Sequence, residues 1–398
     1  GYLQKEWKKD GRRYFHYKMD APILNFYSFL SADYEVKKDK WIGPDGKPVN
    51  IEVYYHKGHE YNLDRMIKGV KKSLDYYTKN FSPYQHRQVR ILEFPGYSSF
   101  AQAFPNTIPY SESIGFIADV RDDDPESVDY PFYVTAHEIA HQWWAHQVIG
   151  GNVQGSVLMS ETMSQYSALM VMKHEYGPEK MKKFLDYEMN SYLVGRTMER
   201  KKEMPLYRVE NQGYIHYRKG SVIMYALADY IGEENLNRAL KNYINKVAFQ
   251  QAPFTNSIEF LGYLKAETPD SLQYLITDMF EKITLYENKA TAATYQKLAD
   301  NKYKVTVTVD AKKLYADSLG TEKIAPLNDW VEIGVLAKKQ VNGHEQDVPL
   351  YLQKHQVKPG QNKFEVIVSE KPSEAGIDPF LKLIDRNPDD NVKKVTSI

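Results

Sequence analysis

Two histidines four residues apart, with a glutamate directly after the first, form the segment of this chain best suited to chemistry. They are His137, Glu138 and His141, within Thr135–Trp144. On a helix, residues i and i+4 share a face, so both imidazoles can reach one ion at ~2.0–2.1 Å. Glu138 lies where it can hold a water beside the ion, without binding the ion itself, and act as the general base. The motif predicts a site for one zinc ion.

Chance is the alternative explanation for this motif, because three residues at fixed positions also recur in unrelated chains. The surrounding sequence favours a real site. The motif falls in a segment of helical periodicity whose apolar residues predict a buried side, namely Ile139, Ala140, Trp143 and Val148.

A catalytic zinc ion needs a third protein ligand and one open position. Glu161 is the best candidate, since it begins a predicted helix that is otherwise apolar. An acidic residue in a first helical turn also complements the helix dipole, which is the alternative role for Glu161. His146 lies about 140° around the helix from the motif histidines, and His174 comes late in the next helix. We expect these two histidines to be structural.

Three features together carry a family resemblance: the His-Glu-x-x-His motif, the later glutamate and a Tyr-x-Lys-Gly further along the chain. In these features the chain resembles the gluzincin zinc aminopeptidases of the bacterial type, which are relatives of aminopeptidase N and leukotriene hydrolase. The resemblance implies that His137, His141 and Glu161 are the zinc ligands and that Glu138 is the general base. The spacing from His141 to Glu161 is one residue longer than is usual in the family, and Ser-Glu-Thr replaces the usual Asn-Glu-Gly. We expect the connecting loop to bulge before the helix and so absorb the extra residue.

The Tyr-x-Lys-Gly match lies in Tyr214–Gly220 and begins with Tyr217. The resemblance implies that Tyr217 stabilises the tetrahedral intermediate. A phenol suits this role because it donates a hydrogen bond to a developing oxyanion and stays neutral at working pH. Aromatic packing at a helix entry is the alternative role.

The family also carries a Gly-x-Met-Glu-Asn strand, whose glutamate binds the free amino group of the substrate. The corresponding stretch, Pro109–Ile117, keeps only Glu112 and Gly115 at the family spacing. The resemblance implies that these two residues bind substrate, because a carboxylate pairs well with an ammonium group. A surface acid beside a strand is the alternative.

Composition excludes several classes of function. The 398 residues carry 52 basic and 52 acidic side chains, and this balance argues against a general role in binding nucleic acid. With no cysteine, the chain has no disulfide and no thiolate ligand, so any metal must use His, Asp or Glu. No apolar run approaches the ~20 residues that span a bilayer. The chain starts at Gly1 in a polar stretch, and we expect it to be a fragment of a longer protein.

The chain is long enough for two or three domains, and we predict an α+β fold. Residues 1–60 look like the β-rich remnant of an N-terminal domain, with apolar runs at Leu24–Leu30 and Val49–Tyr55. Residues 61–287 are expected to form a thermolysin-like zinc peptidase domain. In residues 288–398 a period of two predicts a small Ig-like β-sandwich.

Within these domains the periodicity predicts individual elements. The first expected helix begins near Asn62, which could cap it, and ends near Ser82-Pro83. The other expected helices cover about 131–150, 160–177, 220–231, 234–247, 256–265 and 271–285. The expected strands cover 87–94, 114–120, 303–309, 330–336, 348–352 and 363–368.

Together these observations predict a zinc metallopeptidase that removes N-terminal residues from peptides. One alternative is an endopeptidase of the same fold. Another is a non-catalytic, zinc-stabilised extracytoplasmic module of a membrane transport protein. We expect the chain to be attached to a membrane segment outside the given sequence, on the extracytoplasmic face of a bacterial membrane, with a cytoplasmic location as the alternative.

Overall fold

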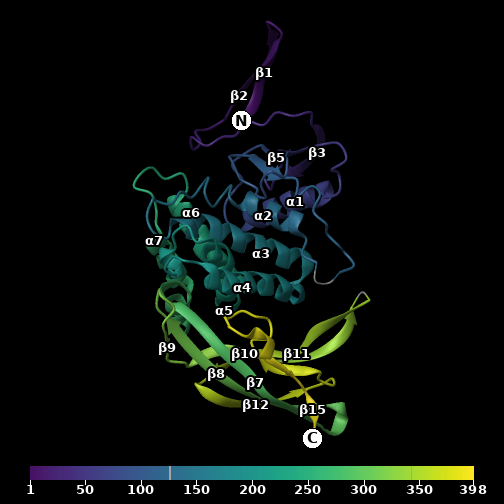
Figure 1. Cartoon of the computed structure of the whole chain (residues 1–398), viewed down its shortest axis with the longest axis vertical. Coiled ribbons are helices and arrows are strands. Elements are labelled where there is room, and N and C mark those ends of the chain that lie inside the picture. The colour runs from purple at the N-terminus through teal and green to yellow at the C-terminus, as the bar shows by residue number, and fades with distance from the viewer. Residues whose placement is uncertain (125–126, 342) are drawn as a thin grey trace.

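An N-terminal hairpin projects from one end of the molecule (Figure 1). The computed structural model describes residues 1–124, 127–341 and 343–398. Strands β1 (Tyr2–Lys9) and β2 (Arg12–Lys18) pair antiparallel. Their two-residue turn has positive φ at both Asp10 and Gly11, as a hairpin turn of this length requires. The strand expected at Leu24–Leu30 is wrong: this stretch is irregular, with no facing strand to pair with among the described residues.

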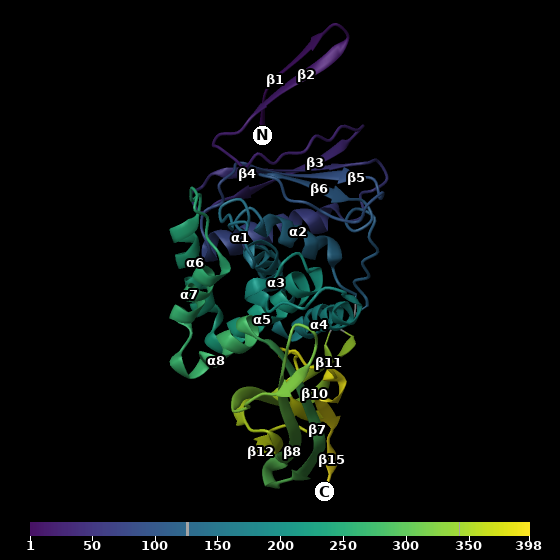
Figure 2. The same ribbon diagram turned by 60° about the vertical axis from the view of Figure 1, so that its left-hand side comes forward.

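A four-stranded sheet follows, in the order β3-β4-β5-β6. Strand β3 (Glu35–Ile42) is antiparallel to β4 (Pro48–Tyr55), while β4, β5 (Gln88–Phe94) and β6 (Thr107–Ser111) run parallel. Figure 2 shows this sheet lying over α1 (Leu63–Asn80) and α2 (Tyr130–Ala140). The expected strands at 49–55 and 87–94 are confirmed.

The strand expected at 114–120 is wrong, because the chain turns directly after β6. Asn62 provides the physical reason. Its side-chain amide donates to the carbonyl oxygens of Gly115 at 2.8 Å and of Ala118 at 2.9 Å, which holds the segment in turns. Asn62 precedes α1 as expected, but its side chain makes no capping hydrogen bond to that helix. The residue expected to cap the helix instead holds a neighbouring loop.

The helices that carry most of the predicted site pack beneath this sheet. Helix α2 ends at Ala140 and not near residue 150, since Ala145 adopts a φ of 149° that no helix accommodates. A π-helical turn, Leu158–Thr162, leads into α3 (Met163–Tyr176), which ends as expected at Gly177 with a φ of 94°. A second π-helical turn, Tyr214–Lys219, leads into α5. The remaining helices are α4 (Met181–Met198), α5 (Gly220–Ile231), α6 (Glu233–Val247) and α7 (Ser257–Glu267).

The helix expected at 271–285 is wrong. A short α8 (Tyr274–Ile276) and a π-helical turn (Thr277–Glu281) precede β7 (Ile283–Lys297), which therefore starts ahead of the expected boundary at 288. Apolar residues at its start pair with β8 and so adopt an extended backbone.

The C-terminal region contains two sheets around a shared core. Their orders are β11-β10-β13-β14 and β12-β8-β7-β15, with β9 beside β8. Buried residues from both sheets share the core, among them Val305, Val307, Ile333, Val335 and Ile377. The bounds are β8 Tyr303–Ala316, β9 Glu322–Ile324, β10 Asp329–Val341, β11 His344–Val357, β12 Gly360–Val368, β13 Glu374–Ile377, β14 Val392–Lys394 and β15 Thr396–Ser397. The four strands predicted here by alternation are confirmed.

The structure is thus a mixed α+β fold, as predicted. Within the described ranges, no helix has the length and apolarity needed to cross a membrane.

Candidate metal centre

Three side chains converge on one point beneath the sheet. Nε2 of His137, on α2, lies 3.1 Å from Nε2 of His141, the residue that follows the helix. Oε2 of Glu161 lies 3.3 Å from the first of these nitrogens and 3.2 Å from the second. Ligand atoms around a tetrahedral zinc ion with bonds of ~2.0–2.1 Å are roughly 3.3 Å apart. The three atoms therefore have the mutual spacing of three corners of a zinc site.

A buried polar atom without a partner also fits a cation at this point. Oε2 of Glu138 is buried and has no hydrogen-bond partner within the described part of the chain, while Oε2 of Glu161 faces the two imidazole nitrogens. A buried carboxylate oxygen without a partner is costly. Two imidazole nitrogens and one carboxylate oxygen are a donor set that zinc accepts with a position left open. The residues present therefore fit the metal.

The imidazole of His141 is oriented by groups behind it. Its Nδ1 lies 2.9 Å from the carbonyl oxygen of Trp144 and 3.0 Å from Oγ of Ser164 on α3. Donation from Nδ1 to that carbonyl selects the tautomer whose Nε2 lone pair faces the centre. Sequence reasoning did not identify Ser164 or Trp144, since neither residue type signals a supporting role by itself.

Electrostatics couple the three converging groups. Burial opposes ionisation of Glu161, but the facing histidines outweigh it and lower the pKa of this carboxyl well below its usual range. Burial also opposes a charge on His141, yet the carboxylates of Glu161 and Glu138 raise its pKa to about 9. The carboxylate of Glu161, held in its negative form and favouring positive charge on His141, makes this point a favourable place for a cation.

Glu138 points into the same buried region, with 5% of its surface exposed. Burial raises the pKa of its carboxyl, while the nearby histidines and a hydrogen bond from the backbone of Ala103 act in the opposite direction. A carboxylate with a raised pKa is better suited than an ordinary one to take up a proton and release it again. The segment holding Ala103 pairs with β6 through bridges at Ala101 and Phe104. No side-chain pattern could have signalled this backbone donor.

Tyr217 lies in the second π-helical turn, with its ring 5.9 Å from the ring of His137. Burial, and then the negative charge of Glu161, raises the pKa of its phenol well above the usual value. The group is therefore a neutral hydrogen-bond donor at any working pH. A cavity of about 720 Å³ opens beside it, with Tyr187, Tyr214 and Arg218 among its lining residues.

Two π-helical turns thus carry two of the four residues predicted outside the histidine motif, Glu161 and Tyr217. In such turns a backbone hydrogen bond joins residue i to residue i+5, and these turns often occur at functional sites. The extra residue between His141 and Glu161 was expected to bulge from the connecting loop. A π-helical turn, which is wider than an α-helical one, now lies at this place and can accommodate it.

Glu112 and Gly115 contribute no atom to the cluster around His137. Oε1 of Glu112 accepts a hydrogen bond from the backbone N–H of Gly96 at 2.7 Å, and the carboxylate lies in a separate group of histidines and glutamates. Gly115 is closely packed: a Cβ there would lie 2.4 Å from the ring of Tyr110 and 2.5 Å from Cε of Met66. Packing therefore explains this glycine without a substrate.

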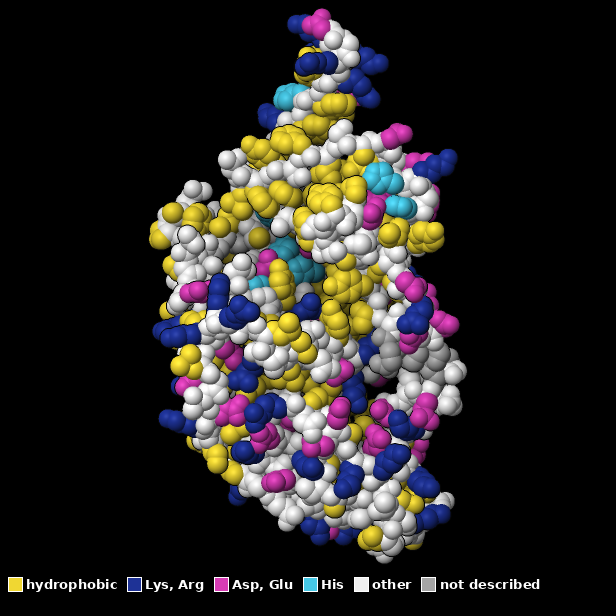
Figure 3. All heavy atoms as spheres, viewed as in Figure 1, with side chains coloured by type: hydrophobic (Ala, Val, Ile, Leu, Met, Phe, Trp, Pro, Cys, Tyr) yellow, Lys and Arg dark blue, Asp and Glu magenta, His cyan; other side chains and the backbone are white. Residues whose placement is uncertain are grey.

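The histidines expected to be structural have other partners. Nε2 of His146 lies 3.0 Å from the carbonyl oxygen of Ala103, and burial lowers its pKa to about 4. Nε2 of His174 lies 2.7 Å from Glu233. In the space-filling view, one group of histidine atoms is recessed in a hollow near the middle of the molecule and another lies at the surface above it (Figure 3).

Residues 65–283 match the model of the peptidase family M1 domain. The chain belongs to peptidase family M1. This confirms the resemblance to the relatives of aminopeptidase N. The matched range contains the two motif histidines, Glu161 and Tyr217.

Individual proteins of similar sequence are named as aminopeptidases. "Probable aminopeptidase 1" of Saccharolobus solfataricus is 25% identical over 197 residues, which are 47% of this chain and 24% of that protein. Human "Endoplasmic reticulum aminopeptidase 2" is 23% identical over 214 residues, 51% of this chain and 22% of that protein. The chain thus spans about a quarter of the length of these relatives. The crystal structure of Legionella pneumophila aminopeptidase A in complex with aspartic acid has a similar fold, with a TM-score of 0.55 at 13% identity over 89% of this chain and 38% of that one.

Proposed function

We propose that this M1 protein is a zinc-dependent metallopeptidase that removes N-terminal residues from peptides. The observation that carries the proposal is the convergence of His137, His141 and Glu161, with ligand atoms 3.1–3.3 Å apart, beside the buried carboxylate of Glu138. A purely structural zinc site would usually be closed by four protein ligands. Three ligands and an adjacent base match the arrangement of a hydrolytic site.

His137, His141 and Glu161 would hold the zinc ion. Bound there, zinc would supply Lewis acidity, polarising the scissile carbonyl and acidifying a nearby water. The carboxylate of Glu138 would take the proton from the attacking water and pass it to the leaving amine nitrogen. The hydroxyl of Tyr217 would donate a hydrogen bond to the oxygen on which negative charge develops.

Glu138→Gln is the direct test, because it keeps the shape of the side chain and removes the base. Peptidase activity should fall at least about 1000-fold while zinc content stays unchanged. Activity would be followed with a panel of aminoacyl fluorogenic substrates, and zinc by elemental analysis. An unchanged turnover on every substrate, or no activity in the parent protein, would favour the non-catalytic module of a transport protein instead.

The exopeptidase part of the proposal is supported by the relatives, which are named as aminopeptidases. Binding of the substrate amine by Glu112, with Gly115 as a second substrate-binding residue, stays a prediction. A matched pair of peptides, one with a free and one with an acetylated N-terminus, separates the two activities. Preference for the free amine supports the aminopeptidase, whereas equal cleavage of both peptides would identify an endopeptidase.

We further propose that residues 61–287 form a thermolysin-like catalytic domain and that residues 288–398 form an Ig-like β-sandwich. The core shared by the two C-terminal sheets supports the second assignment. Residues 1–60 would be the remnant of an N-terminal β domain. The proposed location is the extracytoplasmic face of a bacterial membrane, with attachment through a segment outside this chain. Protease accessibility of the tagged full-length protein in intact cells and spheroplasts would test it.

A further inference from the structure

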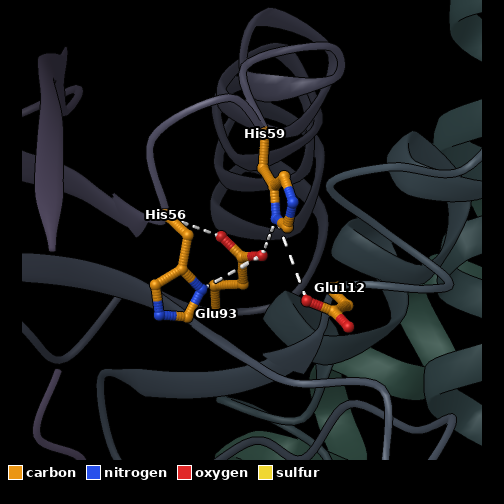
Figure 4. Close-up of side chains that lie close together, drawn as sticks. All are labelled: His56, His59, Glu93 and Glu112. Atoms are coloured by element: carbon orange, nitrogen blue, oxygen red, sulfur yellow. Dashed lines mark hydrogen bonds and ion pairs between the residues drawn. The ribbon is translucent and has the colours of Figure 1, made fainter. Parts of the chain in front are cut away.

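A second group of metal-ligating side chains lies at the carboxyl ends of the parallel strands β4, β5 and β6 (Figure 4). Its members are His56, His59, Glu93 and Glu112, and one ligand atom from each lies within 4.8 Å of the others. They come from the loop between β4 and α1, from β5 and from the residue after β6. The pairing of these strands therefore creates a cluster that no local sequence motif contains.

Glu93 is the centre of this group. Its side chain is fully buried, with 0% exposed. Oε2 accepts a hydrogen bond of 2.6 Å from the backbone N–H of His56, while Oε1 contacts Nδ1 of His59 and lies 3.4 Å from Nδ1 of His56. One oxygen is thus held by the backbone, and the other faces both imidazoles.

Glu112 repeats this arrangement. Oε1 accepts the hydrogen bond from the backbone N–H of Gly96, and Oε2 lies 3.9 Å from Nδ1 of His59. Hydrogen bonds that orient a ligating carboxylate are a regular feature of metal sites. Both carboxylates are therefore held with one oxygen toward Nδ1 of His59.

The surroundings also hold the first histidine in place. The ring of Tyr34 stacks on that of His56, with centroids 5.3 Å apart, and its hydroxyl donates to the carbonyl oxygen of Glu93 at 2.6 Å. The side chains of His56, His59 and Glu112 are 30%, 29% and 23% exposed, so solvent ions can reach the cluster. A buried carboxylate close to another carboxylate requires positive charge, from protonated imidazoles or from a cation.

We propose that His56, His59, Glu93 and Glu112 bind a divalent transition-metal cation, with zinc as the probe. Two imidazole nitrogens and two carboxylate oxygens are a set that zinc accepts, and four protein ligands close its coordination. The ion would act structurally, linking the loop before α1 to β5 and to the end of β6. The inference does not rest on the proposed peptidase activity, and it gives Glu112 a metal-binding role in place of binding the substrate amine.

The test separates the two sites by mutation. The His137→Gln/His141→Gln variant of the full chain removes the motif histidines and leaves the second cluster intact. After loading with zinc and dialysis, elemental analysis should find about one zinc ion per chain. Adding His56→Gln and His59→Gln should remove that ion, whereas adding His16→Gln and His174→Gln, which lie outside the cluster, should not. Zinc should also raise the melting temperature of the first variant and not of the one lacking both clusters.

Two outcomes would overturn the proposal. In the first, the His137→Gln/His141→Gln variant retains no zinc and its melting temperature does not change when zinc is added. That result would mean that the cluster is held by ion pairs alone. The other is zinc retention that survives the changes at His56 and His59.

If those changes prevent folding, as judged by circular dichroism, Glu112→Gln replaces them, because the side chain of Glu112 is partly exposed. This substitution should weaken zinc retention in the same background. None of these results depends on peptidase activity, so failure here and failure of the proposed function are distinguishable.

Discussion

Nε2 of His137 and Nε2 of His141 lie 3.1 Å apart, although α2 ends between the two residues. Two imidazole lone pairs at this separation repel one another unless a proton or a cation lies between them. Glu161 supplies a third atom at almost the same distance from each. The relationship between the two nitrogens therefore marks a point where a proton or a cation must lie, which the His-Glu-x-x-His pattern alone does not show.

Glu161→Gln tests the third ligand. The change removes the negative charge and should weaken zinc binding at the catalytic site by more than about 100-fold, since loss of an outer-shell partner alone costs 10–100-fold. Competition with a chromogenic chelator measures the affinity. Glu234→Gln, an exposed acid on α6, is the control. Tight zinc binding in the Glu161 variant, in a background lacking His56 and His59, would show that another residue is the ligand.

Tyr217→Phe should lower kcat by roughly 10²–10³-fold, because it removes one hydrogen bond to a developing oxyanion. Zinc content and KM should change little, since the phenol is not a ligand and acts mainly in the transition state. Steady-state kinetics measure both parameters. Tyr214→Phe removes a hydroxyl from the same π-helical turn and should have a small effect. Equal losses in the two variants would argue for a structural role of this turn.

Gly115→Ala distinguishes packing from substrate binding. An added methyl group would meet the ring of Tyr110 at 2.4 Å, so the free energy of unfolding should fall by about 1–3 kcal/mol. Gly262→Ala, in α7, is the matched control, and it should change the free energy of unfolding in the opposite direction. No atom lies within 4 Å of the position that an added Cβ would take, so alanine should stabilise the helix by about 0.5–1 kcal/mol. Urea denaturation measures both. A fully stable Gly115 variant with impaired peptide binding would restore the substrate role.

His86 should make the protein less stable in acid. Burial, with a smaller effect of His146, lowers its pKa from 6.5 to about 3, and its Nε2 is buried without a partner among the described residues. The unfolded chain therefore binds this proton more tightly, so stability is complete above pH 6.5 and is lost as the pH falls toward 3. Between pH 7.5 and 5.0 the loss should be about 2 kcal/mol.

Urea denaturation at the two pH values measures this contribution. His86→Gln should reduce the pH dependence by that amount, while the exposed His16→Gln should leave it unchanged. An identical pH dependence in the parent and in the His86 variant would contradict the assignment.

Periodicity predicted most of the regular elements. Helices 220–231 and 234–247 and the four C-terminal strands are encoded by apolar residues repeating over a few turns or pleats, which a local pattern records. The errors have tertiary causes. The segment at 114–120 turns because the Asn62 side chain binds its carbonyl oxygens, and the helix expected at 271–285 gives way to β7 because β8 offers it a strand to pair with. Both contacts join residues far apart in sequence.

The sequence by itself determined the pair His137 and His141 with Glu138 between them, because the helical repeat brings residues i and i+4 to one face within a single turn. It also offered Glu161 as a third ligand from its place at the start of an apolar helix, whereas Tyr217 was identified only through the family resemblance. Only the tertiary structure decided that these two groups meet the histidines, and that Glu112 lies instead with His56, His59 and Glu93. Such meetings depend on how separate segments pack and pair, and that information is spread over the whole chain.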